Sequence, residues 1–498
     1  MTGQIGWTRA LTCLVAGWLI GAAPTSDPLG RLDAFVAKAL IDYRVPGASV
    51  GVVQDGKVVM VKGYGVRDAT KPGKVDENTI FQLASVTKAL TGAAVGTVAD
   101  KDKLDWDAPI VTYLPEFMAS DPYMTRYLTE RDLLAHRTGW PAYQGDAIDS
   151  FGYTRLEIVR RLRYFKPRYS LREVAQYSNP AIFLAGEVAA RVAGQSWNEL
   201  VEKRVYAPLG MTRSGTVTAH LEDGNLSANH VLRGDKAVLT TRNVLDTTGA
   251  ASSGTSTARD MARFVAMLVS HGTFEGKPVL QPETVEQMFR RSMVAGIEFS
   301  EMPPISEATG FYYGLGVDSY DYAGHQIVEK AGALSGVRAV VTLIPELNAG
   351  IVILANLNLT PFPEAVRAFF VDQTLGIPPE AVQKQIVGRN EALKAMFKPA
   401  ERPANPPKFA GTADSLVGVY DNEYYGRCAI ELEGADLRLV CGPAKYAGPV
   451  THWSGGEFVV QFPGATQMPT SMTFNIGADG NADSFTHEEW GLFTRVRK

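Results

Sequence analysis

The spacing of hydrophobic residues changes along the chain, and each change predicts a different kind of element. Apolar positions recur at helical spacing over 29–43, and alternation follows in two stretches joined around Asp55-Gly56, over 48–53 and 58–64. An apolar helix is predicted from residue 85, and a mostly helical stretch follows to about residue 290. Helical periodicity within that stretch is clearest over 156–165, 181–193 and 257–269.

The next part of the chain returns to strand patterns and ends in a helix. Strands are predicted over 313–318, 325–330, 339–344 and 350–354, and a helix over 364–374. Because strands at both ends bracket a helical middle, we predict an α+β sandwich, in which an antiparallel sheet is flanked by helices and carries a helical insertion domain. This domain is predicted to span 27–375.

Beyond residue 375 the composition changes. Prolines punctuate 376–414, which predicts a semi-rigid linker. From 415 to 498 short alternating stretches are separated by Gly and Pro, and this pattern predicts a small all-β domain.

The first residues have the pattern of a secretory signal. An apolar run from Ala10 to Ala23 follows Arg9 and precedes a polar break that begins at Pro24. The run is shorter than the roughly 20 residues that a membrane span needs. We expect a signal peptide over 1–26, a periplasmic or secreted protein, and no stable membrane insertion after signal removal. The alternative is an uncleaved anchor, because Pro24 would sit badly just after a cut.

Two cysteines in the tail flank a predicted hairpin. Alternation on both sides of Gly434-Ala435 indicates a two-residue turn, and in that register Cys428 faces Cys441. The two cysteines then occupy a non-hydrogen-bonded pair, whose Cα separation of about 4.5 Å suits a disulfide. We predict a cross-strand disulfide formed in an oxidising compartment. Two buried free thiols are the alternative.

Composition excludes some classes of partner. Charged residues make up 20% of the chain and the net charge is only −4. No nucleic-acid partner or polybasic membrane contact is therefore expected.

Ser85 and Lys88 carry the first candidate chemistry. They lie three residues apart at the predicted start of an apolar helix, so their side chains share one face. A serine hydroxyl becomes a nucleophile when a nearby base removes its proton, and a buried lysine with a depressed pKa can be that base. Ser85 is the only serine with a lysine three residues on. The pair alone is weak evidence, since Ser85 could merely cap the helix.

Two further motifs follow in the sequence. Tyr177 and Asn179 lie just before a predicted helix, where a phenol can relay protons and an amide can orient a substrate carbonyl or amide. Lys330 and Gly332 close a predicted strand, where a cation could bind a substrate carboxylate and a glycine would let the substrate approach closely.

In this order the motifs resemble those of the penicillin-recognising serine hydrolases, most closely the class C β-lactamase-like branch of esterases, D-amino-acid peptidases and amidases. The resemblance covers about residues 28–375, and its supporting stretches are 133–139, 249–254, 260–263, 345–346 and 355–356. No Gly-x-Ser-x-Gly elbow, His-Glu-x-x-His motif or phosphate-binding loop competes with it.

The resemblance implies a serine hydrolase that needs no metal and no organic cofactor. Ser85 would be acylated, and Lys88 with Tyr177 would form the base, with the formal base undecided because the two titrations are coupled. Asn179 would orient the acyl side chain. The oxyanion hole would be the backbone N–H groups of Ser85 and Ala333.

Two more residues are interpreted through the resemblance. His136 would be a structural part of a loop near the site rather than a member of a Ser-His-Asp triad. Many esterases and peptidases of this branch have histidine where this chain has Lys330, and the permanent charge favours a small-molecule or peptide substrate that bears a carboxylate.

Several alternatives stay open at this level. The enzyme could be a peptidase or amidase, a carboxylesterase or a β-lactamase, and a slow-deacylating penicillin-binding sensor is the non-enzymatic alternative. The tail resembles lipocalin-like domains appended to some of these hydrolases. It could cover the site, build a homo-oligomer, bind a ligand or only stabilise the protein.

Overall fold

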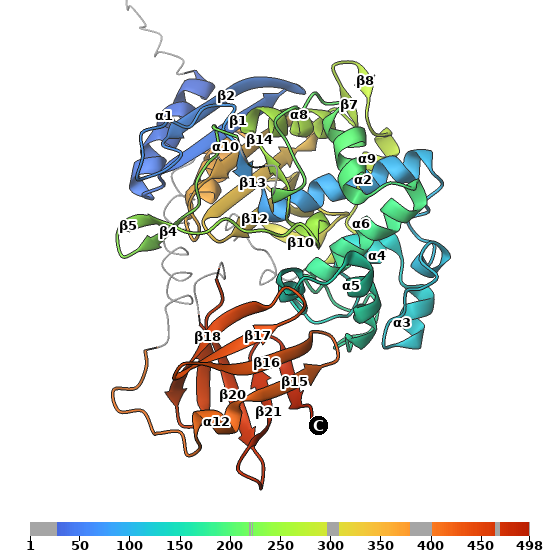
Figure 1. The fold of residues 1–498 in the computed structure, drawn as a ribbon. Coiled ribbons are helices and arrows are strands. Elements are labelled where there is room, and N and C mark those ends of the chain that lie inside the picture. The colour runs from blue at the N-terminus through green and yellow to red at the C-terminus, as the bar shows by residue number, and fades with distance from the viewer. Residues whose placement is uncertain are drawn as a thin grey trace, which may run out of the picture.

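The computed structural model describes residues 27–218, 221, 223–295, 308–378, 401–463 and 469–497. The predicted signal peptide and residues 379–400 of the predicted linker lie outside the described residues. The chain forms a mixed N-terminal domain of helices and one large sheet, followed by a closed β barrel (Figure 1). The predicted α+β architecture with a small C-terminal β domain is confirmed.

The central sheet of the N-terminal domain has eight antiparallel strands and joins distant parts of the chain. β1 pairs with β14 at its centre, with Ala48 opposite Ala355. In sheet order the strands are β2 (Lys57–Gly65), β1 (Gly47–Gln54), β14 (Ala349–Ala355), β13 (Val337–Ile344), β12 (His325–Leu334), β11 (Asp318–Tyr322), β10 (Thr309–Tyr313) and β9 (Met293–Val294).

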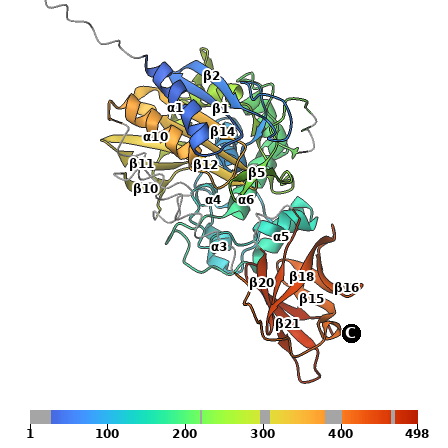
Figure 2. The ribbon, with the colours of Figure 1, turned by 90° about the vertical axis from the view of Figure 1, so that its left-hand side faces the viewer.

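Helices cover both faces of this sheet. α1 (Pro28–Asp42) and α10 (Phe362–Thr374) pack together on one face, while α8 (Ala258–Val269) packs on the other (Figures 1 and 2). Along β14, Ile351 and Ile353 contribute to the core under α1 and α10, whereas Val352 and Leu354 contribute to the core under α8. Because both faces are buried, the central strands are continuously apolar rather than alternating.

The helical region between β2 and β9 supplies one wall of the site. Its helices are α2 (Thr87–Lys101), α3 (Pro122–Tyr127), α4 (Glu130–Leu134), α5 (Arg155–Arg161), α6 (Asn179–Ala193), α7 (Trp197–Leu200), α8 and α9 (Pro282–Phe289). The helices expected over 156–165, 181–193 and 257–269 are present, although α5 ends at Arg161 and continues as a 3₁₀ turn.

The predicted strand over 313–318 is wrong. Residues 314–317 connect β10 to β11 instead of forming a strand. Gly316 has a φ of +79°, and a side chain at Gly314 would place its Cβ 2.2 Å from the carbonyl oxygen of Met288. Both glycines therefore serve a tight connection that packs against α9, and their apolar neighbours suggested a strand that the backbone does not form.

The C-terminal domain is a closed antiparallel barrel in which each strand pairs with the next along the chain. Its strands are β15 (Gly418–Asn422), β16 (Gly426–Glu433), β17 (Asp436–Cys441), β18 (Tyr446–Ser454), β19 (Glu457–Val460), β20 (Thr470–Ile476), β21 (Ala482–His487) and β22 (Gly491–Arg495). A short helix, α12 (Ala413–Leu416), precedes it. Closure removes the exposed strand edges that an open sheet of this kind would present.

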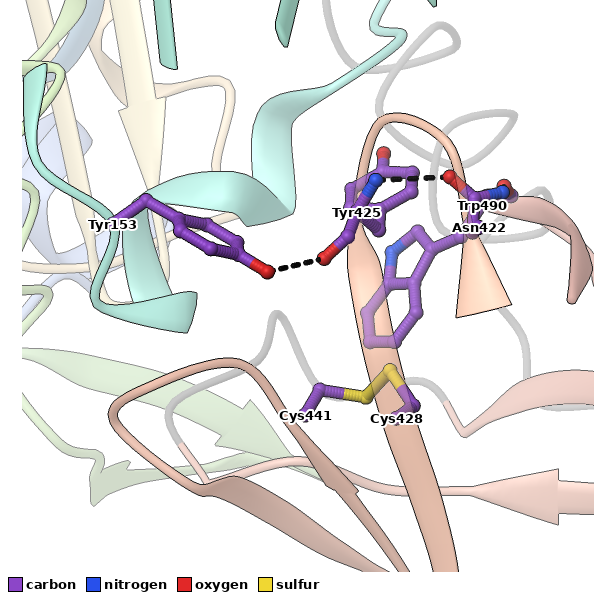
Figure 3. The surroundings of a disulfide bond; sticks show 6 residues. All are labelled: Tyr153, Asn422, Tyr425, Cys428, Cys441 and Trp490. Carbon is purple, nitrogen blue, oxygen red and sulfur yellow. Dashed lines mark hydrogen bonds between the residues drawn. A yellow bond between two sulfur atoms is a disulfide. The ribbon is translucent and has the colours of Figure 1, made fainter. Parts of the chain in front are cut away.

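The hairpin of β16 and β17 has the register expected from sequence. Gly434 takes a φ of +66° in the turn, and Cys428 lies directly opposite Cys441. The structure joins these two cysteines in a disulfide, with a Cα–Cα distance of 4.2 Å (Figure 3).

Candidate active site

Ser85 lies at a sharp backbone turn. The short strand β3 (Phe81–Gln82) leads into a single 3₁₀ turn over Ala84–Val86, and α2 follows directly. Ala84 has a φ of +50°, a left-handed conformation that costs a non-glycine residue about 1–2 kcal/mol. The chain keeps this costly geometry immediately before Ser85, whose side chain is almost completely buried.

Two proton-carrying groups converge on Ser85. The Tyr177 hydroxyl donates a hydrogen bond to Ser85 Oγ at 2.7 Å, and Lys88 Nζ donates to the same oxygen at 3.1 Å. Lys88 is fully buried, and its Nζ lies 4.7 Å from the centre of the Tyr177 ring. The three residues expected to form the acylation machinery are therefore in direct contact.

Lys88 is further held by two oxygen acceptors. Its Nζ donates to the carbonyl oxygen of Ala251 at 2.9 Å and to Asn179 Oδ1 at 2.7 Å. Asn179 is the first residue of α6, which Ser178 caps through a hydrogen bond to the Ala181 N–H. The helix start therefore fixes the amide of Asn179 beside the amine of Lys88.

Lys330 reaches the same site from β12. Its Nζ lies 5.2 Å from the centre of the Tyr177 ring, which puts a cation next to the phenol. It also forms an ion pair with Asp318, at 3.0 Å from Oδ2 and 3.2 Å from Oδ1. From the sequence, Lys330 was expected to bind a carboxylate of the substrate. In the structure it already binds a carboxylate of the protein, that of Asp318.

Gly332 and Ala333 lie beside the Ser85 turn because β12 extends past Lys330 to Leu334. The partner strand β11 begins only at Asp318, opposite Glu329, so the last part of β12 extends beyond this pairing and contacts the Ser85 turn. A Cβ at Gly332 would lie 2.4 Å from Leu83 O and 2.7 Å from Ser85 N. The group that approaches Gly332 closely is thus the backbone of the Ser85 turn, whereas the sequence analysis expected the substrate there. This contact also brings the backbone of Ala333 near that of Ser85.

Asp146 is a site residue that sequence reasoning missed. Its Oδ2 accepts a hydrogen bond from Asn179 Nδ2 at 2.7 Å, so Asn179 bridges Asp146 and Lys88. Asp146 begins a 3₁₀ segment, Asp146–Phe151, after Gly145. No motif marks this loop in the sequence, and only the folded chain brings it beside α6.

His136 supports Tyr177 rather than Ser85. The backbone N–H of Ser178 donates to His136 Nδ1 at 3.1 Å, and the His136 ring centre lies 4.7 Å from that of Tyr177. Burial and the nearby charges of Lys330 and Lys88 hold the pKa of His136 well below its usual value. A neutral imidazole in this position orients the segment that carries Tyr177.

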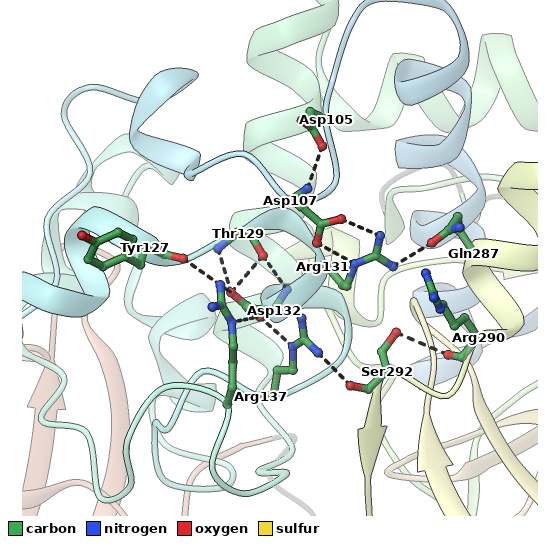
Figure 4. Close-up of polar contacts among 11 residues, drawn as sticks. Asp105, Asp107, Tyr127, Thr129, Arg131, Asp132, Arg137, Gln287, Arg290 and Ser292 are labelled. Carbon is green, nitrogen blue, oxygen red and sulfur yellow. Dashed lines mark hydrogen bonds and ion pairs between the residues drawn. The ribbon is translucent and has the colours of Figure 1, made fainter.

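Asp132, the nearest acidic residue before His136 in the sequence, is already committed to structure. Its buried carboxylate accepts hydrogen bonds from Arg137 Nε at 2.6 Å and Arg172 Nη2 at 2.9 Å (Figure 4). The same carboxylate completes a capping box with Thr129 at the start of α4. This network fixes the loop that carries His136, and it leaves Asp132 occupied by arginines.

Comparison with known proteins matches the two domains to family models. Residues 32–376 match the family model described as Beta-lactamase, and residues 402–495 match a domain of unknown function, DUF3471. The chain is similar to the unguisins hydrolase ungD of Aspergillus violaceofuscus, with 26% identity over 460 residues that cover 84% of this chain and 80% of that protein. It is also similar to protein flp of Staphylococcus aureus, with 25% identity over 346 residues, or 69% of this chain and 66% of that protein.

Two solved structures share the fold. The octameric penicillin-binding protein homologue from Pyrococcus abyssi has a TM-score of 0.61 at 21% identity, and the alignment covers 94% of this chain and 100% of that chain. SurE has a TM-score of 0.57 at 19% identity, covering 94% of this chain and 99% of that chain. Within the described ranges of the present chain, no helix combines the length and apolar character needed to cross a bilayer.

Proposed function

The chain belongs to the β-lactamase family, a membership that supports a serine hydrolase, and we propose that it cleaves an amide, peptide or ester bond through an acyl-enzyme on Ser85. The observation that carries this proposal is the convergence of the Tyr177 hydroxyl and the Lys88 amine on Ser85 Oγ. A serine nucleophile needs a base at hydrogen-bond distance, and the pair of Tyr177 and Lys88 can be that base once it has lost one proton.

Acylation follows from these contacts. In the reactive state the Tyr177–Lys88 pair has lost one proton, from either group, and accepts the proton of Ser85 as Oγ attacks the substrate carbonyl carbon. The backbone N–H groups of Ser85 and Ala333 would stabilise the oxyanion, and removal of one such donor typically costs about 3–4 kcal/mol in the barrier. The pair then returns the proton to the leaving amine or alcohol as the bond to the carbonyl carbon breaks.

Deacylation reverses the roles. Water attacks the acyl carbon, the Tyr177–Lys88 pair takes the proton of that water, and Ser85 Oγ leaves with a proton returned by the pair. The presence of both Tyr177 and Lys88 at Ser85 Oγ supports deacylation by this route, and so a hydrolase rather than a slow-deacylating sensor. The printed name of the Aspergillus relative, a hydrolase similar over most of both chains, supports the same choice. A β-lactamase is the second candidate, because it would use the same groups.

We also propose that the protein acts outside the cytoplasm, in the periplasm or as a secreted enzyme. The Cys428–Cys441 disulfide supports this location, since such bonds persist in oxidising compartments. Lys330 was expected to favour a substrate that bears a carboxylate. Because Lys330 forms an ion pair with Asp318, its charge is already balanced, and this preference is weaker than expected.

Turnover by matched serine variants tests the proposal. Wild type, Ser85→Ala and a remote control, Ser484→Ala on β21, are assayed with p-nitrophenyl butyrate, D-amino-acid amides and a fluorescent penicillin. We expect wild type and the control to turn over a substrate and Ser85→Ala to lose this activity. Equal turnover by wild type and Ser85→Ala would refute the assignment of Ser85, and a stable penicillin adduct without turnover would favour the sensor.

A further inference from the structure

Two oxygen atoms that hold the Lys88 amine lead back to one short segment. Asn179 Oδ1 accepts the amine at 2.7 Å, and Ala251 O accepts it at 2.9 Å. Asn179 is in turn bound by Asp146. The turn that ends at Ala251 is bound by Asp149, through the residue before the turn. A 3₁₀ segment has three residues per turn, so these two acidic residues lie on the same side of it.

Asp149 binds the start of the turn that carries Ala251. Its Oδ1 accepts the Thr248 N–H at 2.7 Å and the Thr248 hydroxyl at 3.0 Å. Thr248 precedes the 3₁₀ turn Gly249–Ala251, and its carbonyl oxygen accepts the Ala251 N–H at 3.1 Å. A short series of hydrogen bonds therefore connects the Asp149 carboxylate with the residue whose carbonyl oxygen accepts the Lys88 amine.

The turn is also fitted to α2 and to the loop that follows it. Ala250 O accepts the Thr91 hydroxyl at 2.7 Å, and α2 carries both this threonine and the lysine of the site. Ser253 Oγ donates to Gly249 O at 3.1 Å. These bonds join neutral groups, whereas the bonds to an ionised Asp149 are charge-assisted and about twice as strong. The carboxylate is therefore a main determinant of where the turn lies against α2.

The barrel holds the segment that carries both carboxylates at its two ends. Before the segment, the Tyr424 hydroxyl donates to Gly145 O at 3.4 Å. At its end, the Ala444 N–H donates to Phe151 O at 2.9 Å, and the Phe151 ring centre lies 5.2 Å from that of Trp490. The carboxylates are thus fixed from the barrel side before substrate binds, as a precise site requires.

Asp149 is a buried carboxylate, which is costly for a fold to keep. The residue is 8% exposed, and burial raises its pKa from an ordinary value of 3.8 to about 6, although the bonds from Thr248 lower it. The titratable groups near it and near the loop that binds it come from several elements, and they are Asp146 of the same segment, Asp246 of that loop, Arg155 of α5 with Glu187 of α6, and Tyr446 and Glu489 of the barrel. Among them Asp246 acts on Asp149 directly, and its negative charge raises the pKa further. Ionised buried groups of this kind concentrate at functional sites.

We propose that Asp149 is a positioning residue for Lys88. By holding Thr248, its carboxylate sets the place of Ala251 O. That oxygen in turn directs the Lys88 amine towards Ser85 Oγ. This inference rests on the proposed function, because the lysine needs this position only as part of the base for Ser85.

Asp149→Asn isolates the charge, because the carboxamide keeps an oxygen acceptor for Thr248 and is neutral like the protonated acid. At pH 8, where Asp149 is ionised, we expect kcat/KM for p-nitrophenyl butyrate to fall about tenfold, since a displacement of about 1 Å in a site can cost about 10²-fold. As pH falls from 7 to 5, wild-type Asp149 takes up a proton and its bonds to Thr248 weaken. The ratio of wild-type to variant kcat/KM should therefore shrink towards one. Titration of the Tyr177–Lys88 pair occurs in both proteins and cancels in this ratio.

Asp260→Asn is the matched control. Asp260 Oδ2 accepts the Arg213 N–H at 2.8 Å and the Ser214 hydroxyl at 3.0 Å, so it makes the same two kinds of bond as Asp149. Burial raises its pKa as well. Because these bonds lead to residues other than Thr248, this variant should keep a kcat/KM near that of wild type from pH 5 to pH 8.

The melting temperature separates positioning from a stabilising role. The folded chain binds the Asp149 proton at a higher pH than the unfolded chain, so stability from this group is complete below pH 3.8 and is lost as pH rises through 6. Asp149→Asn should therefore melt at pH 8 no lower than wild type, although its activity is reduced. Thr248→Val removes one of the two donors, and it should lose activity several-fold while its activity keeps the pH dependence of wild type.

The outcomes separate this proposal from the proposed function. A ratio of wild-type to Asp149→Asn activity near one at pH 8, or a ratio that stays constant down to pH 5, would overturn the role of Asp149. Equal falls in activity and melting temperature in Asp149→Asn and Asp260→Asn would overturn it too, as would wild-type activity in Thr248→Val. Ser85-dependent turnover of p-nitrophenyl butyrate is measured in parallel. Its presence keeps the proposed function intact when the role of Asp149 fails, and its absence overturns both.

Discussion

The N-terminal domain and the barrel bury different kinds of side chain. The N-terminal domain places the cations Lys88 and Lys330 in its interior, together with the ion pair of Arg367 and Glu329. The barrel interior is filled with aromatic side chains, which are Tyr420, Phe458, Phe474, Phe485 and Phe493. Buried charges are costly unless they are paired, so their concentration in one domain marks where the chemistry is.

The same comparison teaches what the barrel can do. Its interior is occupied by its own rings, whose centres lie 4.7–5.7 Å apart in stacked, tilted and edge-to-face pairs, so the interior favours stability over ligand binding. Its end facing the N-terminal domain instead contacts the segment of Asp146 and Phe151. The barrel therefore contributes to the site from outside, through the loop that it holds.

The largest expected effect lies in the charged interior. Replacing Lys88 with Met or Tyr177 with Phe should each lower kcat/KM for p-nitrophenyl butyrate by about 10²–10⁴-fold, because each variant removes a proton-carrying group from Ser85 Oγ. Steady-state kinetics measures this effect. The double variant should lose much less than the product of the two single losses, since the groups act as one unit. Additive losses would argue against a shared base.

The sequence predicts those site residues that are close together in the chain or belong to an ordered set of motifs, and it misses those that meet only in the fold. The i and i+3 spacing of Ser85 and Lys88 is local, and the order of the motifs placed Tyr177 and Lys330 with them. Asp146 and Asp318 were not predictable, because they meet Asn179 and Lys330 only through loop packing and strand pairing. The hairpin of Cys428 and Cys441 was predictable to the residue, because its turn is short and its alternation is regular.

The second effect concerns the stability of the barrel. Replacing Cys428 and Cys441 together with Ser should lower the free energy of unfolding of the barrel by about 3 kcal/mol, the value for a loop of this size. Denaturant unfolding followed by barrel tryptophan fluorescence, with Trp490 beside the hairpin end, measures this change. A fully stable double variant would show that aromatic packing alone holds the barrel.

A third effect is a pH dependence of the barrel. Burial lowers the pKa of His487 to about 4, from an ordinary value near 6.5, so the fold favours its neutral form. The unfolded chain binds a proton at higher pH than the folded one, so this stability is complete above pH 6.5 and is lost as pH falls through 4. The loss should approach roughly 3 kcal/mol, at 1.36 kcal/mol for each pKa unit. His487→Asn should unfold with a flatter pH profile, and an unchanged profile would contradict the assignment.

The smallest effect tests the contact between the two regions. Phe151→Leu keeps most of the buried volume but removes the ring contacts with Trp490 and Tyr425, at an expected cost of about 1 kcal/mol. If the barrel holds the Asp146 segment, and through it Asn179 beside Lys88, this variant should lower kcat/KM for p-nitrophenyl butyrate several-fold. A wild-type kcat/KM together with a lower melting temperature would show that the barrel contact only stabilises the protein.

The most direct test of the central claim is identification of the acylated residue. Wild-type protein is mixed with a slowly hydrolysed ester or a penicillin, quenched in acid, digested and sequenced by tandem mass spectrometry. The account predicts one acyl adduct, on Ser85, that forms within the turnover time and disappears as product accumulates. Product formation with no adduct on Ser85, or with the acyl group on another residue, would contradict it.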